Sequence, residues 1–239
     1  MNSGIPLLVF LIIFGTTLIR ATVGFGNALI AMPLLVMLLG VRTASPLVAL
    51  LGPVIAVAML VLEWEEIDVR AAGKLLLASL VGIPVGLFFL SRAPESLVRG
   101  VLGLVLVGFG IYNLWGPPLP TLRQPVFSYL FGFIAGILGG AYNTNGPPVV
   151  IYGVMRRWSA EKFRATLQGY FLISGLLILL GHGLSGLWTR EVWNLFYVSL
   201  PAALLAVLVG SWAARRIPEE RFRLTVNLFL IAAGFLMFL

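Results

Sequence analysis

The segment 138–151, with the sequence LGGAYNTNGPPVVI, constrains the fold of this chain most. It lies inside the apolar run 126–155, where a membrane protein normally has one continuous helix. Pro147 and Pro148 lack a backbone N–H, and a residue that precedes proline is driven out of the α region. We therefore predict a break near the middle of the run. Freed backbone groups persist in a bilayer only when they are buried in protein or line a polar cavity.

The composition predicts an all-α, polytopic integral membrane protein. Of 239 residues, 60% are hydrophobic and only 10% are charged. A span needs ~20 apolar residues, so the chain has room for about eight or nine spans. There is no cysteine, which excludes disulfides and thiolate chemistry. In a protein of the lipid bilayer the net charge of +7 reports topology, so we expect no nucleic-acid partner.

A second interruption near the N-terminus indicates an internal repeat. Its sequence is Thr22-Val-Gly-Phe-Gly-Asn27, and a shift of 115 residues places Gly24 on Gly139. Further along, an R-x-P-E-x-x-x-R motif begins at Arg92 and again at Arg216, a shift of 124 residues. A shared motif together with a shared break is the pattern of duplicated halves.

The predicted architecture is two homologous four-helix repeats, each opening with a broken helix that is either discontinuous or re-entrant. Residues 1–115 form the first repeat and residues 126–239 the second. The proline-rich segment 116–125 links them.

The arginine-rich loops leave two topologies open. If each broken helix crosses the bilayer once, the loops at Arg42, Arg92, Arg156 and Arg216 share one side, which the positive-inside rule assigns to the cytoplasm. If each is a hairpin that returns to its own side, the two halves are inverted, as in many transporters. Charge bias favours the single crossing in this interpretation.

The two breaks are the predicted substrate site. Glycines let a ligand approach the backbone, and a half-helix that starts near Pro147 points its positive end into the second break. Backbone N–H groups together with that dipole favour an anion. The predicted binding residues are Arg20, Gly24, Phe25, Gly26, Asn27, Gly139, Gly140, Tyr142, Asn143, Thr144, Asn145, Gly146, Pro147 and Gln168.

Arg20 is the most informative single residue. It lies four positions before Gly24, near the middle of its apolar run. A charge at that depth is costly and marks a functional candidate, here the counter-charge of an anionic substrate. Gln168 either lines the path or forms an interhelical hydrogen bond. His182, the only histidine, is interpreted as interfacial.

The chain lacks the motifs of several other classes. It has no nucleotide-binding G-x-x-x-x-G-K-[ST] motif, and no Asp or Glu lies within an apolar run. We predict no catalytic residue, no metal and no cofactor, so an intramembrane enzyme is disfavoured. A structural subunit, whose breaks only bend helices, is the third class. A secondary transporter of small anions fits best, because a negative interior favours outward movement of one negative charge by ~2.3 kcal/mol per 100 mV.

The G-F-G-N break and the G-G-A-Y-N-T-N-G-P-P-V-V-I-Y break resemble the TauE/SafE family of sulfite exporters and 4-toluene sulfonate uptake permeases. The resemblance covers nearly the whole chain. It implies export, or in some members uptake, of sulfite, sulfonates or related oxyanions across the bacterial inner membrane. A transporter of another small anion is the alternative, and a homodimer is the one assembly considered. The family's motif residues match Gly24, Gly26, Asn27, Gly139, Gly140, Asn143, Gly146 and Pro147.

Overall fold

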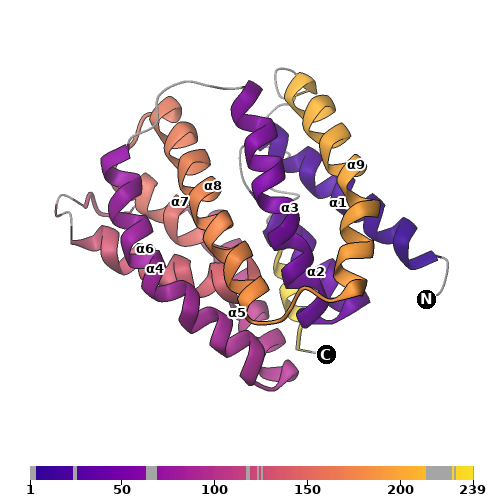
Figure 1. The fold of residues 1–239 in the computed structure, drawn as a ribbon. Coiled ribbons are helices and arrows are strands. Elements are labelled where there is room, and N and C mark those ends of the chain that lie inside the picture. The colour runs from indigo at the N-terminus through magenta and orange to yellow at the C-terminus, as the bar shows by residue number, and fades with distance from the viewer. Residues whose placement is uncertain are drawn as a thin grey trace.

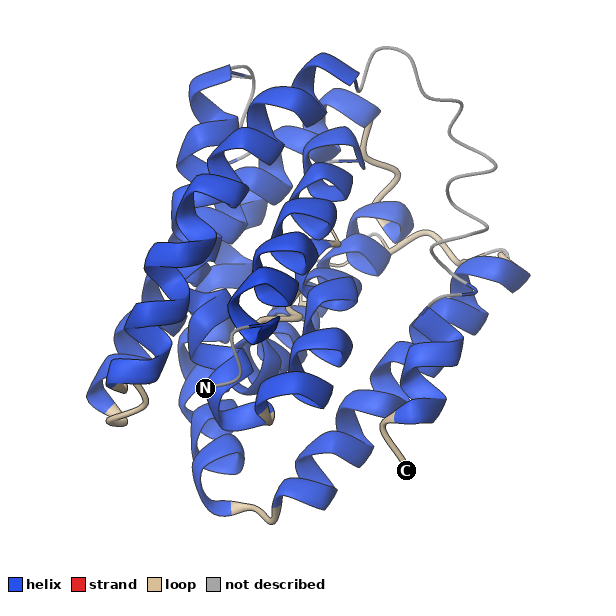
Figure 2. Ribbon diagram, turned by 90° about the vertical axis from the view of Figure 1, so that its right-hand side faces the viewer, coloured by secondary structure: helices blue, strands red, loops and turns tan. Residues whose placement is uncertain are grey.

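The computed structural model describes residues 4–23, 26–62, 69–116, 119–122, 124, 126–213, 228 and 230–238. Within these residues all regular elements are helices (Figures 1 and 2). The labelled helices are α1 (Gly4–Val23), α2 (Asn27–Leu39), α3 (Val41–Leu62), α4 (Val69–Arg92), α5 (Glu95–Trp115), α6 (Phe127–Tyr142), α7 (Gly146–Met155), α8 (Ala160–Leu184) and α9 (Arg190–Ala213). Residues 230–236 are also helical.

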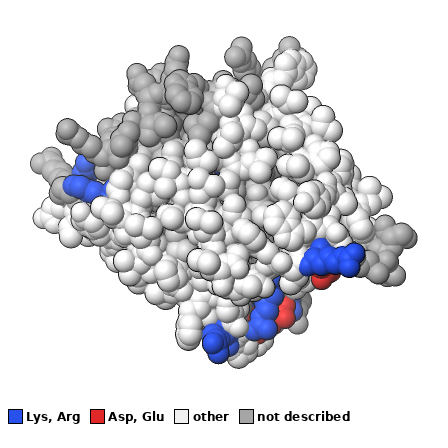
Figure 3. Space-filling model, in the orientation of Figure 1, with Lys and Arg blue, Asp and Glu red and all other residues white. Residues whose placement is uncertain are grey.

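Six of the described helices are long and apolar enough to cross a membrane, namely α1, α3, α4, α5, α8 and α9. By contrast, α2, α6 and α7 have only 13, 16 and 10 residues. The described part of the chain therefore has fewer span-length helices than the eight or nine that its length allows. On the face shown in Figure 3, charged side chains lie near the margins and a broad uncharged surface separates them. This pattern confirms an all-α membrane protein.

Glycines bring α4 and α6 into backbone contact. Gly132, Gly136 and Gly140 follow one another at intervals of four residues, which places them on one face of α6. A Cβ atom at Gly132 would overlap the backbone of Leu75, and one at Gly140 would overlap the carbonyl oxygen of Ile83. Small residues at this spacing are the usual means of close helix packing in membranes.

The contacts also fix the relative directions of the helices. Along α4 and α6 they advance together, from Leu75 with Gly132 to Ile83 with Gly140, so the two helices run in the same direction. The Ser79 hydroxyl bonds the Tyr170 hydroxyl at 2.7 Å, and Leu87 meets Gly181 further on, so α8 also runs with α4. Since α3 leads directly into α4 and runs opposite to it, α3 and α8 are antiparallel (Figure 1).

Helices α6 and α7 form a hairpin that returns to the end where it began. The Leu122 N–H, just before α6, donates to the Met155 carbonyl at 2.9 Å, and Arg156 Nη1 donates to the Leu122 carbonyl at 2.9 Å. Between these ends, the Phe131 and Tyr152 rings lie 5.7 Å apart. These contacts contradict a single crossing by this pair, so the topology that charge bias favoured is wrong for α6 and α7.

Candidate functional site

The second break is a short turn between α6 and α7. Helix α6 ends at Tyr142, and Asn143 takes the left-handed conformation with φ 57°. The Asn143 N–H donates to the Gly139 carbonyl, which is the bond of an αL-type helix end, and the Thr144 N–H donates to the Leu138 carbonyl. The break is thus Asn143–Asn145, shorter than the sequence predicted. The reason is that Gly140 packs against α4 and Gly139 against Ile178 of α8, while the two prolines occupy the first turn of α7, where no N–H is needed.

Side chains from α3 and α8 satisfy the backbone groups that this break frees. His182 Nε2 lies 3.0 Å from the Gly140 carbonyl, and the Ser45 hydroxyl donates to the Ala141 carbonyl at 2.9 Å. The amide of Asn143 donates to the Ser45 carbonyl at 2.7 Å. These bonds meet the requirement that a helix end inside a bilayer keeps its polar groups paired. His182 is fully buried in the protein and lies in the last turn of α8, near the end of that span, so its placement at the membrane interface stays a prediction.

Several predicted binding residues serve the scaffold around the second break. The Tyr142 hydroxyl donates to the Val98 carbonyl of α5 at 2.8 Å. Gly140 faces α4, and a Cβ atom at Gly139 would lie 2.8 Å from Ile178 Cδ1. Pro147 is buried in the first turn of α7. None of these four predicted residues lines the cavity described below.

The first break separates α1 from α2. Gly24 and Phe25 lie outside the described residues. Gly26 has φ 99°, a left-handed conformation that favours glycine, and it precedes the first turn of α2. The Asn27 side-chain oxygen accepts the Ala28 N–H at 2.8 Å. The side chain of Asn27 thus stabilises the start of its own helix.

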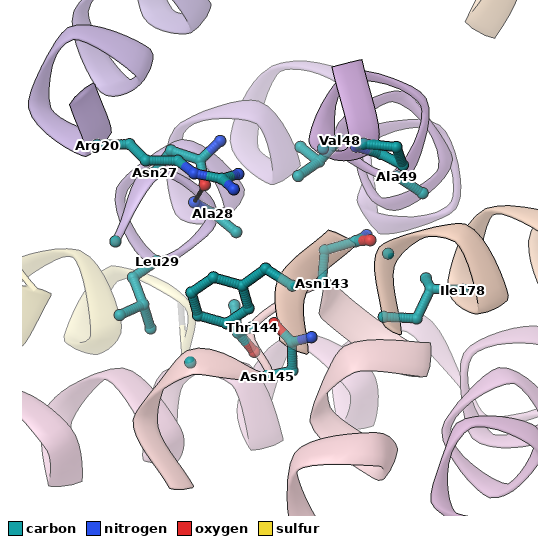
Figure 4. A pocket seen from close by; sticks show the side chains of 16 residues that line it. Arg20, Asn27, Ala28, Leu29, Val48, Ala49, Asn143, Thr144, Asn145 and Ile178 are labelled. Carbon is teal, nitrogen blue, oxygen red and sulfur yellow. Dashed lines mark hydrogen bonds between the residues drawn. The ribbon is translucent and has the colours of Figure 1, made fainter. Parts of the chain in front are cut away.

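A cavity of about 50 Å³ lies between the two breaks. Figure 4 shows Arg20 and Asn27 on one side of it and Thr144 and Asn145 on the other. At ~10–15 Å³ for each water-sized sphere, this space holds a few waters or one compact ion. It is lined by Arg20, Gly26, Asn27, Ala28, Leu29, Val48, Ala49, Gly52, Pro53, Asn143, Thr144, Asn145, Gly146, Phe171, Gly175 and Ile178.

Arg20 lines this cavity from the last turn of α1 and is only 5% exposed. Its Nη2 atom lies 3.5 Å from Gln168 Oε1, the outer limit of a hydrogen bond, and its guanidinium carbon lies 5.7 Å from the centre of the Phe171 ring. Within the described residues, Arg20 Nε and the Thr144 hydroxyl are buried without a hydrogen-bond partner. Two unpaired donors at one cavity indicate a ligand that accepts hydrogen bonds.

The electrostatics of the cavity favour an anion. Arg20 is the only charged side chain among the described residues that line it. The starts of α2 and α7 face the same space, and helix N-termini attract negative charge. Pro147 and Pro148 have no N–H, so within the first three residues of α7 only Gly146 offers an amide donor. No cluster of potential metal ligands exists within the described part of the chain.

The sequence did not identify the walls that α3 and α8 contribute. Each helix places a bulky residue and a glycine one turn apart on the cavity, Val48 with Gly52 and Phe171 with Gly175. This i, i+4 spacing was the available signal, but apolar residues at that spacing occur on every membrane helix. Gln168 contacts Arg20 without lining the cavity itself.

A polytopic helical membrane protein that encloses a polar cavity between helix ends has the design of a membrane transporter. The chain matches the family model described as sulfite exporter TauE/SafE over residues 9–237. It therefore belongs to this family, whose members are membrane transporters. The protein is accordingly a multi-pass protein of the cell membrane and a transporter rather than an enzyme.

Two relatives illustrate the family. The chain is 26% identical over 178 residues to the probable inner membrane transporter protein TsaS of Comamonas testosteroni. The matched region covers 72% of this chain and 73% of that relative. It is 24% identical over 221 residues to the probable sulfite/organosulfonate exporter TauE of Cupriavidus necator. Here the matched region covers 90% of this chain and 85% of the relative. No solved structure is significantly similar to the chain.

Proposed function

We propose that this protein is a secondary transporter that exports small sulfur-containing anions, such as sulfite or organosulfonates, through the cavity between the two breaks. The observation that carries the proposal is the buried Arg20, whose cavity has no acidic lining among the described residues. A relative described as a probable sulfite/organosulfonate exporter supports the substrate class. Asn27, Thr144 and Asn145 are the polar groups proposed to complete the site.

The site replaces the hydration that an anion loses inside the bilayer. Arg20 supplies the opposite charge, and the starts of α2 and α7 supply oriented peptide dipoles. Because these groups are fixed by the fold, they need no reorganisation when the anion arrives. Outward movement of one negative charge is favoured by ~2.3 kcal/mol per 100 mV of negative interior potential, so export needs no second energy source.

We also propose that the protein consists of two inverted repeats, with α1 and α2 as the counterpart of the α6–α7 hairpin. Two contacts support this relation. A Cβ atom at Gly86 would overlap the carbonyl oxygen of Ile137, and one at Gly210 would lie 3.0 Å from the carbonyl oxygen of Leu18. Gly86 and Gly210 are separated by the 124 residues of the sequence repeat, while Leu18 and Ile137 are separated by 119. The same glycine of each half thus meets the first helix of the other half.

Inverted repeats satisfy the positive-inside rule as well as parallel ones do. With both hairpins re-entrant, the side of the α7–α8 loop receives most of the 16 basic residues. The opposite side keeps only Arg42, Arg92, Arg99 and Arg190. A single crossing also leaves four basic residues on the side with fewer of them. The distribution of basic residues therefore does not distinguish the two topologies.

The transport proposal is tested by anion flux from proteoliposomes. The purified protein is reconstituted, and efflux of sulfite, thiosulfate, sulfoacetate and taurine is measured under a negative interior potential. We expect sulfite efflux that rises with the potential. If no anion leaves the proteoliposomes faster than it leaves protein-free vesicles, the proposed function is refuted.

The repeat proposal is tested by labelling single cysteines with a membrane-impermeant thiol reagent. The chain has no native cysteine, so no background substitution is needed. Ser96 is exposed in the first turn of α5, and Ser159 is exposed directly before α8. We expect Ser96→Cys and Ser159→Cys to label from opposite sides of the membrane. Labelling of both from one side would support the single-crossing topology instead.

A further inference from the structure

Phe171 lies between Arg20 and the start of α7, the two parts of the cavity that attract an anion. The guanidinium carbon of Arg20 lies 5.7 Å from the centre of the ring. At the tip of the ring, Phe171 Cζ lies 3.6 Å from where a Cβ atom at Gly146, the first residue of α7, would be. One face of the ring therefore meets the positive charge, while its edge meets the start of α7.

The rest of the cavity is divided between polar and apolar walls. Arg20 and Thr144 carry the unpaired donors, whereas Val48 and Ile178 add apolar surface beside Phe171. An oxyanion held by Arg20 must turn its remaining side toward this apolar surface. For sulfite that side is a lone pair, and for an alkanesulfonate it is the carbon chain.

We propose that Phe171 determines substrate specificity by limiting the length of the carbon chain on a bound sulfur oxyanion. The proposal rests on the proposed transport function. The cavity of about 50 Å³ suits sulfite and the shortest sulfonates. A longer chain requires the volume that the ring occupies, and a packed ring does not yield it without strain. Replacing Phe171 with a smaller residue extends the range of substrates to longer sulfonates.

The test measures how alkanesulfonates of increasing length compete with radiolabelled sulfite for transport in proteoliposomes. The series runs from methanesulfonate to butanesulfonate. For the native protein we expect inhibition constants that rise steeply with chain length. Because a misfit in an apolar pocket changes discrimination by ~10–200-fold, Phe171→Ala should reduce the butanesulfonate to methanesulfonate ratio at least ~10-fold. Phe171→Leu should reduce it by less.

A matched control is Phe88→Ala, which removes the same ring from a position of α4 that is 67% exposed and outside the cavity. Its ratio should equal that of the native protein. An unchanged ratio in Phe171→Ala, with sulfite transport retained, would overturn the size limit. Loss of sulfite transport in correctly folded Phe171→Ala and Phe171→Leu would also overturn it, because the ring would then serve to hold Arg20. If the native protein transports no sulfur anion, the proposed function fails instead.

Discussion

The two breaks face the same cavity, yet they are built for different tasks. In the second break, Asn143 and Asn145 donate outward, to Ser45 on α3 and to Ser174 on α8. In the first break, the Asn27 oxygen is used locally, on the Ala28 N–H. The charge of the cavity comes from Arg20, just before the first break.

This difference indicates a division of labour between the two hairpins. In the second break, both asparagines are tied to neighbouring helices, and the Thr144 hydroxyl is the group left for the anion. Arg20, in the last turn of α1 just before the first break, is the group proposed to recognise the anion. In the repeat relation proposed above, the 119-residue offset of Leu18 and Ile137 replaces the 115-residue shift of the sequence comparison and makes the uncharged Gly139 the counterpart of Arg20. In that proposal, the two copies share their geometry, and a single arginine in one copy supplies the charge.

The largest expected effect is on transport when the charge of the first hairpin is removed. In Arg20→Gln the loss of a charged hydrogen bond of ~2–3 kcal/mol lowers the apparent affinity for sulfite by ~30–150-fold. Thermal stability in detergent should not fall, because an unpaired buried charge is itself costly. Arg20→Lys keeps the charge without the planar guanidinium group, so its apparent affinity for sulfite should lie between those of the native protein and Arg20→Gln. Native-like flux in Arg20→Gln would show that the two hairpins do not divide their tasks in this way.

The next effect concerns the packing that holds the second hairpin. In Gly140→Ala the new methyl group overlaps the Ile83 carbonyl, which should lower the free energy of unfolding by ~1–3 kcal/mol. Gly108 of α5 is the matched control, since a Cβ atom there would have no neighbour within 4 Å. Gly108→Ala should be neutral or stabilising by up to ~1 kcal/mol. Equal changes in thermal midpoint for the two variants would contradict the proposed α4–α6 contact.

The smallest effect separates the asparagines of the two breaks. Asn145→Ala removes the hydrogen bond that the Asn145 amide donates to the Ser174 hydroxyl, which then keeps only its own bond to the Tyr170 carbonyl, so the change should cost ~1–2 kcal/mol of stability. Asn27→Ala removes only the local bond from the Ala28 N–H, at ~0.5–1 kcal/mol, while it weakens anion binding. Denaturation midpoints and sulfite flux, measured on both variants, check this. A greater loss of stability in Asn27→Ala than in Asn145→Ala would reverse the assignment.

Much of the fold was predictable from the sequence, because lipid permits few backbone solutions. Composition alone defines an all-α membrane protein, and the Asn-Thr-Asn run with its two prolines locates the second break to within a few residues. The roles of Gly139 and Gly140 were not predictable, since glycine serves both loops and close helix packing. The sequence left the hairpin as one of two open topologies, because the choice depends on Leu122 meeting Met155 across 33 residues of sequence.

The sequence predicted the charged residue of the site but not the apolar residues that line it. Arg20 is conspicuous as a charge within an apolar run, whereas Phe171 is one of 16 phenylalanines in the chain. Which of those rings faces the cavity depends on how α8 is rotated against α3 and α6. That rotation is set by contacts such as His182 with Gly140, between residues far apart in sequence.

The most direct test of the central claim is an experimental structure determined with selenite, which has the shape and charge of sulfite and scatters X-rays anomalously. We predict a selenium peak between the two breaks, with its oxygens within hydrogen-bond distance of Arg20 and the Thr144 hydroxyl. Strong selenium density elsewhere in the protein, with none beside Arg20, would contradict an anion site at this cavity.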